Sequence, residues 1–116
     1  MSMIRGGMMY KQLDVVFTPF PYSDLSGSKK RPAIIISNGK LDNSEDVICC
    51  LITSRIPKLG ILIEEDAFEE DNLPFKSWIK HYRIFTVNKG TIVKRLAKVK
   101  NSYYNKIFYS ICSYIK

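Results

Sequence analysis

Histidine and cysteine are scarce in this chain. Its 116 residues include one histidine, His81, and three cysteines. A single imidazole excludes any mechanism that needs two of them. The cysteines, Cys49, Cys50 and Cys112, are odd in number, and none lies in a CxxC or Cys/His spacing. The sequence therefore predicts neither a disulfide framework nor a zinc site, and we expect no metal and no cofactor.

Long apolar runs are also missing. No segment approaches the roughly 18 consecutive apolar residues that a membrane helix needs, and no basic-then-apolar signal opens the chain. We therefore expect a cytoplasmic protein without membrane contact. Because 46% of the residues are hydrophobic and seven Tyr and six Phe are present, the composition also argues against disorder. A chain of this length and composition predicts one globular domain.

Acidic residues are absent after Asp71. All eleven acids lie at or before that position, whereas residues 72–116 hold ten of the eighteen basic residues, and the formal net charge is +7. Like charges gathered in one stretch repel one another unless a partner neutralises them. We interpret residues 72–116 as a basic strip that attracts a polyanion, either a nucleic acid or an acidic protein. The alternative is a solvated surface that only aids solubility.

The pattern of apolar and β-branched residues predicts a mainly β domain. The predicted strands cover residues 14–19, 33–37, 47–52, 61–63, 77–85 and 91–99, with a helix as the alternative for residues 91–99. The nearly continuous apolar run at 33–37 predicts a strand that is buried on both faces. The acidic block 64–71 predicts a loop or a short helical turn, bounded by Pro74. Cys49 and Cys50 are expected to point to opposite faces of their strand, one inward and one outward, which suits core filling.

A helix is predicted at the end of the chain. Ser102 is a candidate N-cap, and the apolar residues that follow it recur at three- and four-residue intervals. These residues are Tyr104, Ile107, Phe108, Ile111 and Ile115. Five or six short strands closed by one terminal helix predict a small barrel or a curled sheet.

Arg31 is the first candidate for chemistry. It follows Lys29 and Lys30 and precedes Pro32, so it stands where a polar loop becomes a rigid strand. An arginine at such a junction presents a planar fork of donors to a phosphate, with little conformational entropy left to lose. The alternative is a cation that flanks a buried strand and protects it from aggregation.

Thr53 and Ser54 are the second candidates, with Arg55 beside them. Both hydroxyls end a predicted buried strand, where they can donate to a phosphate oxygen or to a ribose. Ordinary turn chemistry is the alternative for this pair.

His81 is the only side chain whose unperturbed pKa lies near neutrality. Its neighbours Lys80, Tyr82 and Arg83 favour a role in base stacking or proton transfer. A half-buried structural histidine is the alternative.

Taken in order, these motifs resemble the PemK/MazF family, the toxins of type II toxin-antitoxin systems. The resemblance begins with residues 14–24, Asp-Val-Val-Phe-Thr-Pro-Phe-Pro-Tyr-Ser-Asp, and continues through residues 26–37, Ser-Gly-Ser-Lys-Lys-Arg-Pro-Ala-Ile-Ile-Ile-Ser. Residues 47–56 look like the family's strand that ends in Ile-Thr and a small residue, and residues 83–89 are similar to its later strand and turn. The likeness covers nearly everything from Asp14 to the final helix.

Residues 1–9 contain Gly6-Gly7, four methionines and no apolar period, and are expected to be a loose leader before a single domain over residues 10–116. The resemblance implies that this domain is a small SH3-like β-barrel with a C-terminal helix. It implies a growth-arresting, metal-independent and sequence-selective endoribonuclease that acts on single-stranded messenger RNA. The family's catalytic Arg and Thr map onto Arg31 and Thr53. The candidate RNA-binding residues are Ser26, Ser28, Lys29, Lys30, Ser54, Arg55 and His81. The family's usual Gly before Asp14 is Leu13 here, and the general base has no sure equivalent beyond Asp24.

The resemblance also implies partners. We expect a homodimer whose RNA groove lies near the subunit interface, and an acidic antitoxin whose tail folds on binding and covers Arg31. Operator DNA would be bound only through the antitoxin complex. The rival hypothesis is a non-catalytic module of the same fold that captures a protein such as gyrase. Residues 29–32 followed downstream by Thr53 favour the ribonuclease, because a gyrase poison does not need that pair.

Overall fold

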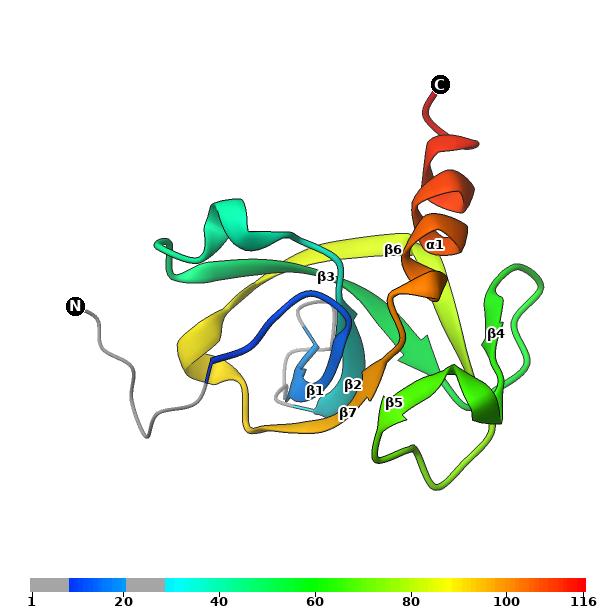
Figure 1. Cartoon of the computed structure of the whole chain (residues 1–116), viewed down its shortest axis with the longest axis horizontal. Helices are drawn as coiled ribbons and strands as arrows, with labels where there is room; N and C mark the ends of the chain where they lie inside the picture. The colour runs from blue at the N-terminus through cyan, green and yellow to red at the C-terminus, as the bar shows by residue number, and fades with distance from the viewer. Residues whose placement is uncertain (1–8, 21–28) are drawn as a thin grey trace.

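The computed structural model describes residues 9–20 and 29–116 (Figure 1). The described strands are β1 (Asp14–Pro19), β2 (Lys30–Ile35), β3 (Asp46–Thr53), β4 (Ile61–Ile63), β5 (Phe68–Glu70), β6 (Ser77–Asn88) and β7 (Lys94–Val99). Single turns of 3₁₀ helix lie at η2 (Gly39–Leu41), η3 (Glu65–Ala67) and η4 (Lys89–Thr91), and α1 (Ser102–Cys112) follows β7. Within these ranges no helix is long and apolar enough to cross a membrane.

The seven strands form one antiparallel sheet in the order β4-β6-β3-β2-β1-β7-β5. The long strand β6 arches over the sheet, which curls into a half-barrel, and α1 stands beside it at one end (Figure 1). The predicted fold class, a mainly β barrel-like sheet with a C-terminal helix, is confirmed. The strand count is corrected from five or six to seven.

Both faces of the central strands are buried. Cys50 packs in one core cluster with Val15, Ile34 and Ile107 of α1, whereas Cys49 packs in a second cluster on the other face. The two cysteines therefore alternate as predicted, but the expectation that one points outward is wrong, because curling covers the second face as well. The prediction that residues 33–37 lie in a strand buried on both faces is confirmed for Ala33, Ile34 and Ile35.

Strand β5 lies within the acidic block, where the sequence predicted only a loop or a helical turn. The turn is present as η3, but Phe68 and Glu70 then pair with Val99 and Lys98 of β7. A three-residue strand at a sheet edge has no room for an alternating pattern. Its acidic side chains are accommodated by the cations of the neighbouring strand, which the local sequence does not reveal.

Helix α1 begins at Ser102, so Ser102 is not its N-cap. Asn101 occupies that position in helical conformation and makes no side-chain cap bond. Ile107 is fully buried and Tyr103, Tyr104 and Ile111 pack against the core, whereas Phe108 and Ile115 of the predicted apolar face are exposed. Ile115 lies beyond the end of α1 at Cys112, and α1 stands at one end of the sheet (Figure 1).

Candidate functional site

A hollow of about 520 Å³ opens where the ends of three strands meet the segment between β5 and β6. The residues that line it are Phe17, Arg31, Pro32, Ile52, Thr53, Ser54, Arg55, Asn72, Leu73, Pro74, Phe75, Ser77, Lys94 and Leu96. The hollow therefore brings together four residues that the sequence singled out, Arg31 from β2 and the run 53–55 at the end of β3.

The strand register explains why Arg31 and Thr53 share one site. Strands β2 and β3 pair Ala33 with Leu51 in antiparallel register, and extending this register by two residues sets Arg31 level with Thr53. Pro32 has no N–H to donate and fixes its own φ, so the chain is stiff just where Arg31 leaves the ladder. The Arg31 Cζ also lies 5.6 Å from the ring centroid of Phe20, a cation–π contact that restrains its side chain.

Thr53 ends β3 with its hydroxyl in a defined state. Its Oγ1 accepts a hydrogen bond from the backbone N–H of Arg55 at 3.1 Å. One acceptor position is thereby used while the hydroxyl proton stays available for donation. The turn-forming role proposed as the alternative is thus real, and it fixes the oxygen in a position from which it can donate to an anion.

Lys94 is a site residue that sequence reasoning missed. It opens β7 opposite Phe17 of β1 and lines the hollow with Arg31 and Arg55. Among the described lining residues there are three cations and no carboxylate, which makes the hollow suited to an anion. The only sequence signal for Lys94 was its place in the basic strip, and its position in the site depends on the pairing of β1 with β7.

Residues 72–75 also line the hollow, and sequence reasoning missed them too. Leu73 packs against the core, and the Ser77 hydroxyl donates to the Phe75 carbonyl at 2.8 Å. The Phe75 side chain remains 71% exposed at the rim. A Pro-Phe pair before a predicted strand was the available signal, but nothing local indicated that it shares a hollow with Arg31.

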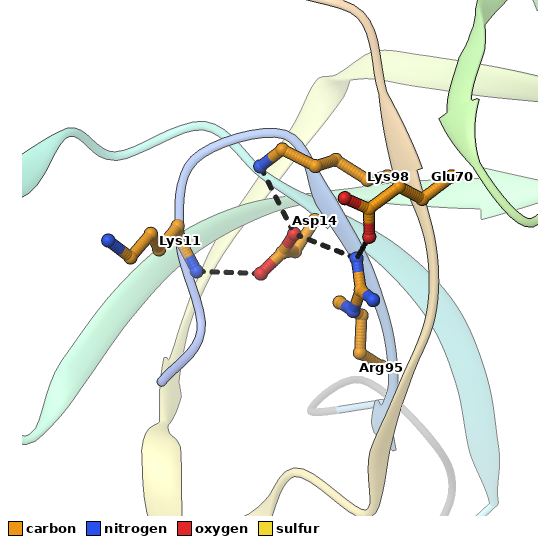
Figure 2. A network of polar contacts seen from close by, with 5 residues as sticks. All are labelled: Lys11, Asp14, Glu70, Arg95 and Lys98. Carbon is orange, nitrogen blue, oxygen red and sulfur yellow. Dashed lines mark hydrogen bonds and ion pairs between the residues drawn. The ribbon is translucent and has the colours of Figure 1, made fainter. Parts of the chain in front are cut away.

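A polar network joins strand β5, which precedes this segment in the chain, to the rest of the sheet (Figure 2). Arg95 Nη1 lies 2.9 Å from Glu70 Oε1 and 3.8 Å from Asp14 Oδ1, and Lys98 Nζ lies 3.5 Å from the same Asp14 oxygen. The backbone N–H of Lys11 donates to Asp14 Oδ2 at 2.8 Å. The hydrogen bond to Glu70 raises the pKa of the Arg95 guanidinium above its ordinary value. The network thus joins β1, β5 and β7.

The same contacts correct one step of the charge argument. Arg95 and Lys98 of the basic strip are paired with acids from earlier in the chain. Lys89 Nζ donates to the carbonyls of Leu41, Asp42 and Ser44 at 2.8–3.1 Å. Lys89, Arg95 and Lys98 of the basic strip are therefore neutralised or hydrogen-bonded within the fold. These three cations need no external partner.

The remaining predicted residues that the structure describes, Lys29, Lys30 and His81, are not among those that line the hollow. Lys29 and Lys30 are exposed at the start of β2. His81 is buried at 5% exposure, and its ring stacks on Tyr114 with centroids 5.3 Å apart. Burial lowers the pKa of His81 and favours the neutral imidazole. Ser26 and Ser28 lie outside the described residues.

A register shift explains the position of His81. Cys50 pairs with Ile84 and Leu51 pairs with Lys80, so β6 carries three extra residues opposite one step of β3. The extra residues include His81, whose carbonyl accepts a weak bond from Cys50 Sγ at 3.6 Å. The bulge turns this part of β6 toward the end of the chain rather than toward the hollow.

A comparison with known protein families gives a match over almost the whole chain. A sequence profile of PemK-like, MazF-like toxins of type II toxin-antitoxin systems matches residues 11–115. The chain belongs to this family. No curated protein sequence matches it. The resemblance that the sequence motifs carried is thereby confirmed.

Solved structures of PemK/MazF-like proteins share the fold at low sequence identity. An endoribonuclease from a mycobacterial species matches with a TM-score of 0.71 and 18% identity over 96% of this chain and 95% of that one. MazF from Deinococcus radiodurans matches with a TM-score of 0.70 and 14% identity over 93% and 97%. A mycobacterial endoribonuclease in complex with its cognate antitoxin gives 0.69 and 18% over 91% and 92%.

Proposed function

We propose that this PemK/MazF-like toxin is an endoribonuclease that cleaves single-stranded RNA in the hollow. The observation that carries the proposal is the meeting of Arg31 and Thr53 in a site with two further cations, Arg55 and Lys94. An anion with a backbone of repeated phosphates fits such a lining. The mycobacterial proteins of the same fold are described as endoribonucleases, which supports the same chemistry here.

The proposed reaction uses the ribose next to the scissile phosphate. Its 2′-hydroxyl attacks phosphorus, the bond to the 5′-oxygen breaks, and the products are a cyclic phosphate and a 5′-hydroxyl. Negative charge builds on the nonbridging oxygens of the pentacoordinate phosphate, where fixed donors lower the barrier. Arg31 and the Thr53 hydroxyl supply those donors. Because its guanidinium stays protonated, Arg31 acts as an electrostatic clamp and hydrogen-bond donor rather than as a base, while solvent water takes the proton of the 2′-hydroxyl and protonates the leaving 5′-oxygen.

The other charged and hydroxyl residues extend this binding site along the RNA. Ser54, Arg55 and Lys94 line the same hollow and would hold neighbouring phosphates or riboses. Contacts of RNA with Ser26, Ser28, Lys29, Lys30 and His81 stay predictions. Buried His81 would reach RNA only after a rearrangement of Tyr114, which covers its ring.

An acidic antitoxin is the proposed protein partner. A carboxylate-rich segment would meet the same three cations as the RNA backbone and would compete with it for Arg31. The antitoxin-bound mycobacterial structure and the MazE–MazF structures from Deinococcus radiodurans support this arrangement by their shared fold. Contact with operator DNA would then be made by the antitoxin.

Cleavage of a long unstructured RNA in the presence of a chelator tests the proposal. The parent chain is expected to cut at defined positions. Loss of one transition-state donor costs about 10²–10³ in rate, so Arg31→Ala and Thr53→Ala should be nearly inactive. Lys40→Ala is the matched control, because Lys40 is an exposed cation on η2 that does not line the hollow. Intact RNA after incubation with the parent, or unchanged rates in both variants, would refute the nuclease and favour capture of a protein target.

A further inference from the structure

We propose that Phe75 is a base-stacking residue, which receives a base of the RNA strand whose phosphate lies at Arg31 and Thr53. The inference rests on the proposed function and adds a contact to it. A single exposed apolar side chain is ordinary on a protein surface. Phe75 differs because its ring is 71% exposed and also forms part of a hollow lined by three cations.

The ring stands on a segment that is fixed on both sides. Before it, Pro74 has a locked φ and Leu73 packs against the core. After it, the Ser77 hydroxyl donates to the Phe75 carbonyl at 2.8 Å. A backbone held in this way gives up little conformational entropy when a ligand lands on the ring. The exposed ring of Phe75 therefore stands on a restrained backbone and not on a loose loop.

Anchoring of the preceding strand extends this fixation to the sheet. Strand β5 ends at Glu70, which pairs with Arg95 at 2.9 Å, and the chain then turns sharply at Asp71, whose φ is 59°. Residues 72–75, which follow this turn, all line the hollow. The cations Arg31, Arg55 and Lys94 and the ring of Phe75 thus line one site.

The three cations and the phenyl ring together specify the kind of ligand that fits the hollow. A cationic lining selects an anion, and an exposed phenyl ring selects a flat apolar surface. A nucleotide in a single strand carries both groups on one unit, because its unpaired base is free to leave the stack. Stacking on a phenyl ring is tolerant of base identity, so Phe75 should contribute affinity for RNA rather than choice of sequence.

Replacement of single bases by abasic sites tests the contact. After the cleavage site of the parent has been mapped, short RNAs around it are made with a 2′-deoxyribose at the cut position, and with one abasic site at each position in turn. Stacking on an aromatic side chain is worth about tenfold in affinity per base. One abasic position should therefore weaken binding to the parent about tenfold, and that same position should cost Phe75→Ala nothing further.

Conservative and matched variants separate stacking from a structural effect. Phe75→Trp should restore both the affinity and its sensitivity to the abasic site, whereas Phe75→Leu should restore neither. Tyr109→Ala is the control, because Tyr109 is similarly exposed at 69% but lies on α1 outside the hollow. In cleavage assays Phe75→Ala should raise KM about tenfold with kcat nearly unchanged, and its thermal unfolding should match that of the parent.

The outcomes distinguish this inference from the proposed function. Suppose that the parent cleaves RNA, that Phe75→Ala binds RNA as tightly as the parent does, and that each abasic site weakens both proteins equally. The stacking contact is then refuted and the nuclease stands. If Phe75→Leu restores binding as well as Phe75→Trp, the ring serves only as an apolar surface and the inference fails. A parent chain that neither binds nor cuts RNA overturns both.

Discussion

Among single residues, the buried cysteines give the clearest expectation. Burial raises the pKa of both Cys49 and Cys50 to about 12, and Cys112 is only partly buried. Since the thiolate is the reactive form, neither core cysteine should react with a thiol reagent at pH 8. We expect Cys112 alone to be labelled in the folded protein and all three cysteines in denaturant, as counted by mass spectrometry. Rapid labelling of Cys49 or Cys50 in the native state would show that the core opens on the timescale of the assay.

Site residues could be predicted where a local sequence motif contains them. They could not be predicted where strand pairing alone brings them to the site. Arg31 and Thr53 stand out in the sequence because Arg31 precedes one predicted strand and Thr53 follows another, each next to polar residues, and the family resemblance joined them. Lys94 and Phe75 reach the same hollow through the pairing of β7 and the turn after β5, which no local pattern encodes.

Leu13 shows the opposite case, in which the sequence misleads about the backbone. The family's usual glycine suggests that a leucine would loosen this turn. Instead Leu13 adopts a φ of 74°, in the region that favours glycine, while its side chain is fully buried in the core. The turn is also closed by bonds between Lys11 and Asp14. Burial of the leucine side chain, worth about 2–5 kcal/mol, outweighs a backbone strain of about 1–3 kcal/mol.

At the scale of elements, the attachment of β5 to its neighbours depends on two carboxylates of unequal burial. The Asp14 side chain is 5% exposed, whereas that of Glu70 is 52% exposed, although both contact Arg95. A solvated ion pair contributes about 0–1 kcal/mol. Removing a buried acceptor leaves its donors unsatisfied and costs about 1–3 kcal/mol. We therefore expect Asp14→Ala to lower the free energy of unfolding clearly more than Glu70→Gln, as measured by urea denaturation. Equal losses would mean that the exposed pair holds the network together.

The elements were predictable where an apolar or β-branched run marked them in the sequence. Strands β1 and β4 have the predicted bounds, and β3 and β6 extend the predicted ones by a few residues. The three-residue strand β5 was missed, because it is defined by its partner β7 rather than by its own composition. Strand β7 begins at Lys94 rather than at residue 91, since η4 occupies the Thr91 end of that segment. Short edge strands and 3₁₀ turns depend on tertiary contacts that apolar periodicity does not contain.

On the scale of the whole molecule, several exposed apolar residues lie apart from the hollow. On β6 and in the residues that follow α1 they include Tyr82, Ile84, Tyr114 and Ile115. The rings of Tyr82, His81 and Tyr114 contact one another, with centroids 5.3–6.4 Å apart. The bulge of β6 is therefore in contact with the end of the chain. We name the residues Tyr82, Ile84, Tyr114 and Ile115 the β6–α1 patch. An apolar patch of this kind marks an interaction surface.

A second copy of this chain is the expected occupant of the β6–α1 patch. Light scattering at micromolar concentration should give about twice the 13.4 kDa mass of one chain. Tyr114→Asp places a charge inside the patch, where its desolvation opposes association, and should shift the mass toward that of the monomer. Leu59→Asp is the matched control, because Leu59 is an exposed apolar residue between β3 and β4 outside the patch. A parent mass of 13.4 kDa that does not change with concentration would exclude the homodimer, and with it any RNA groove shared between two subunits.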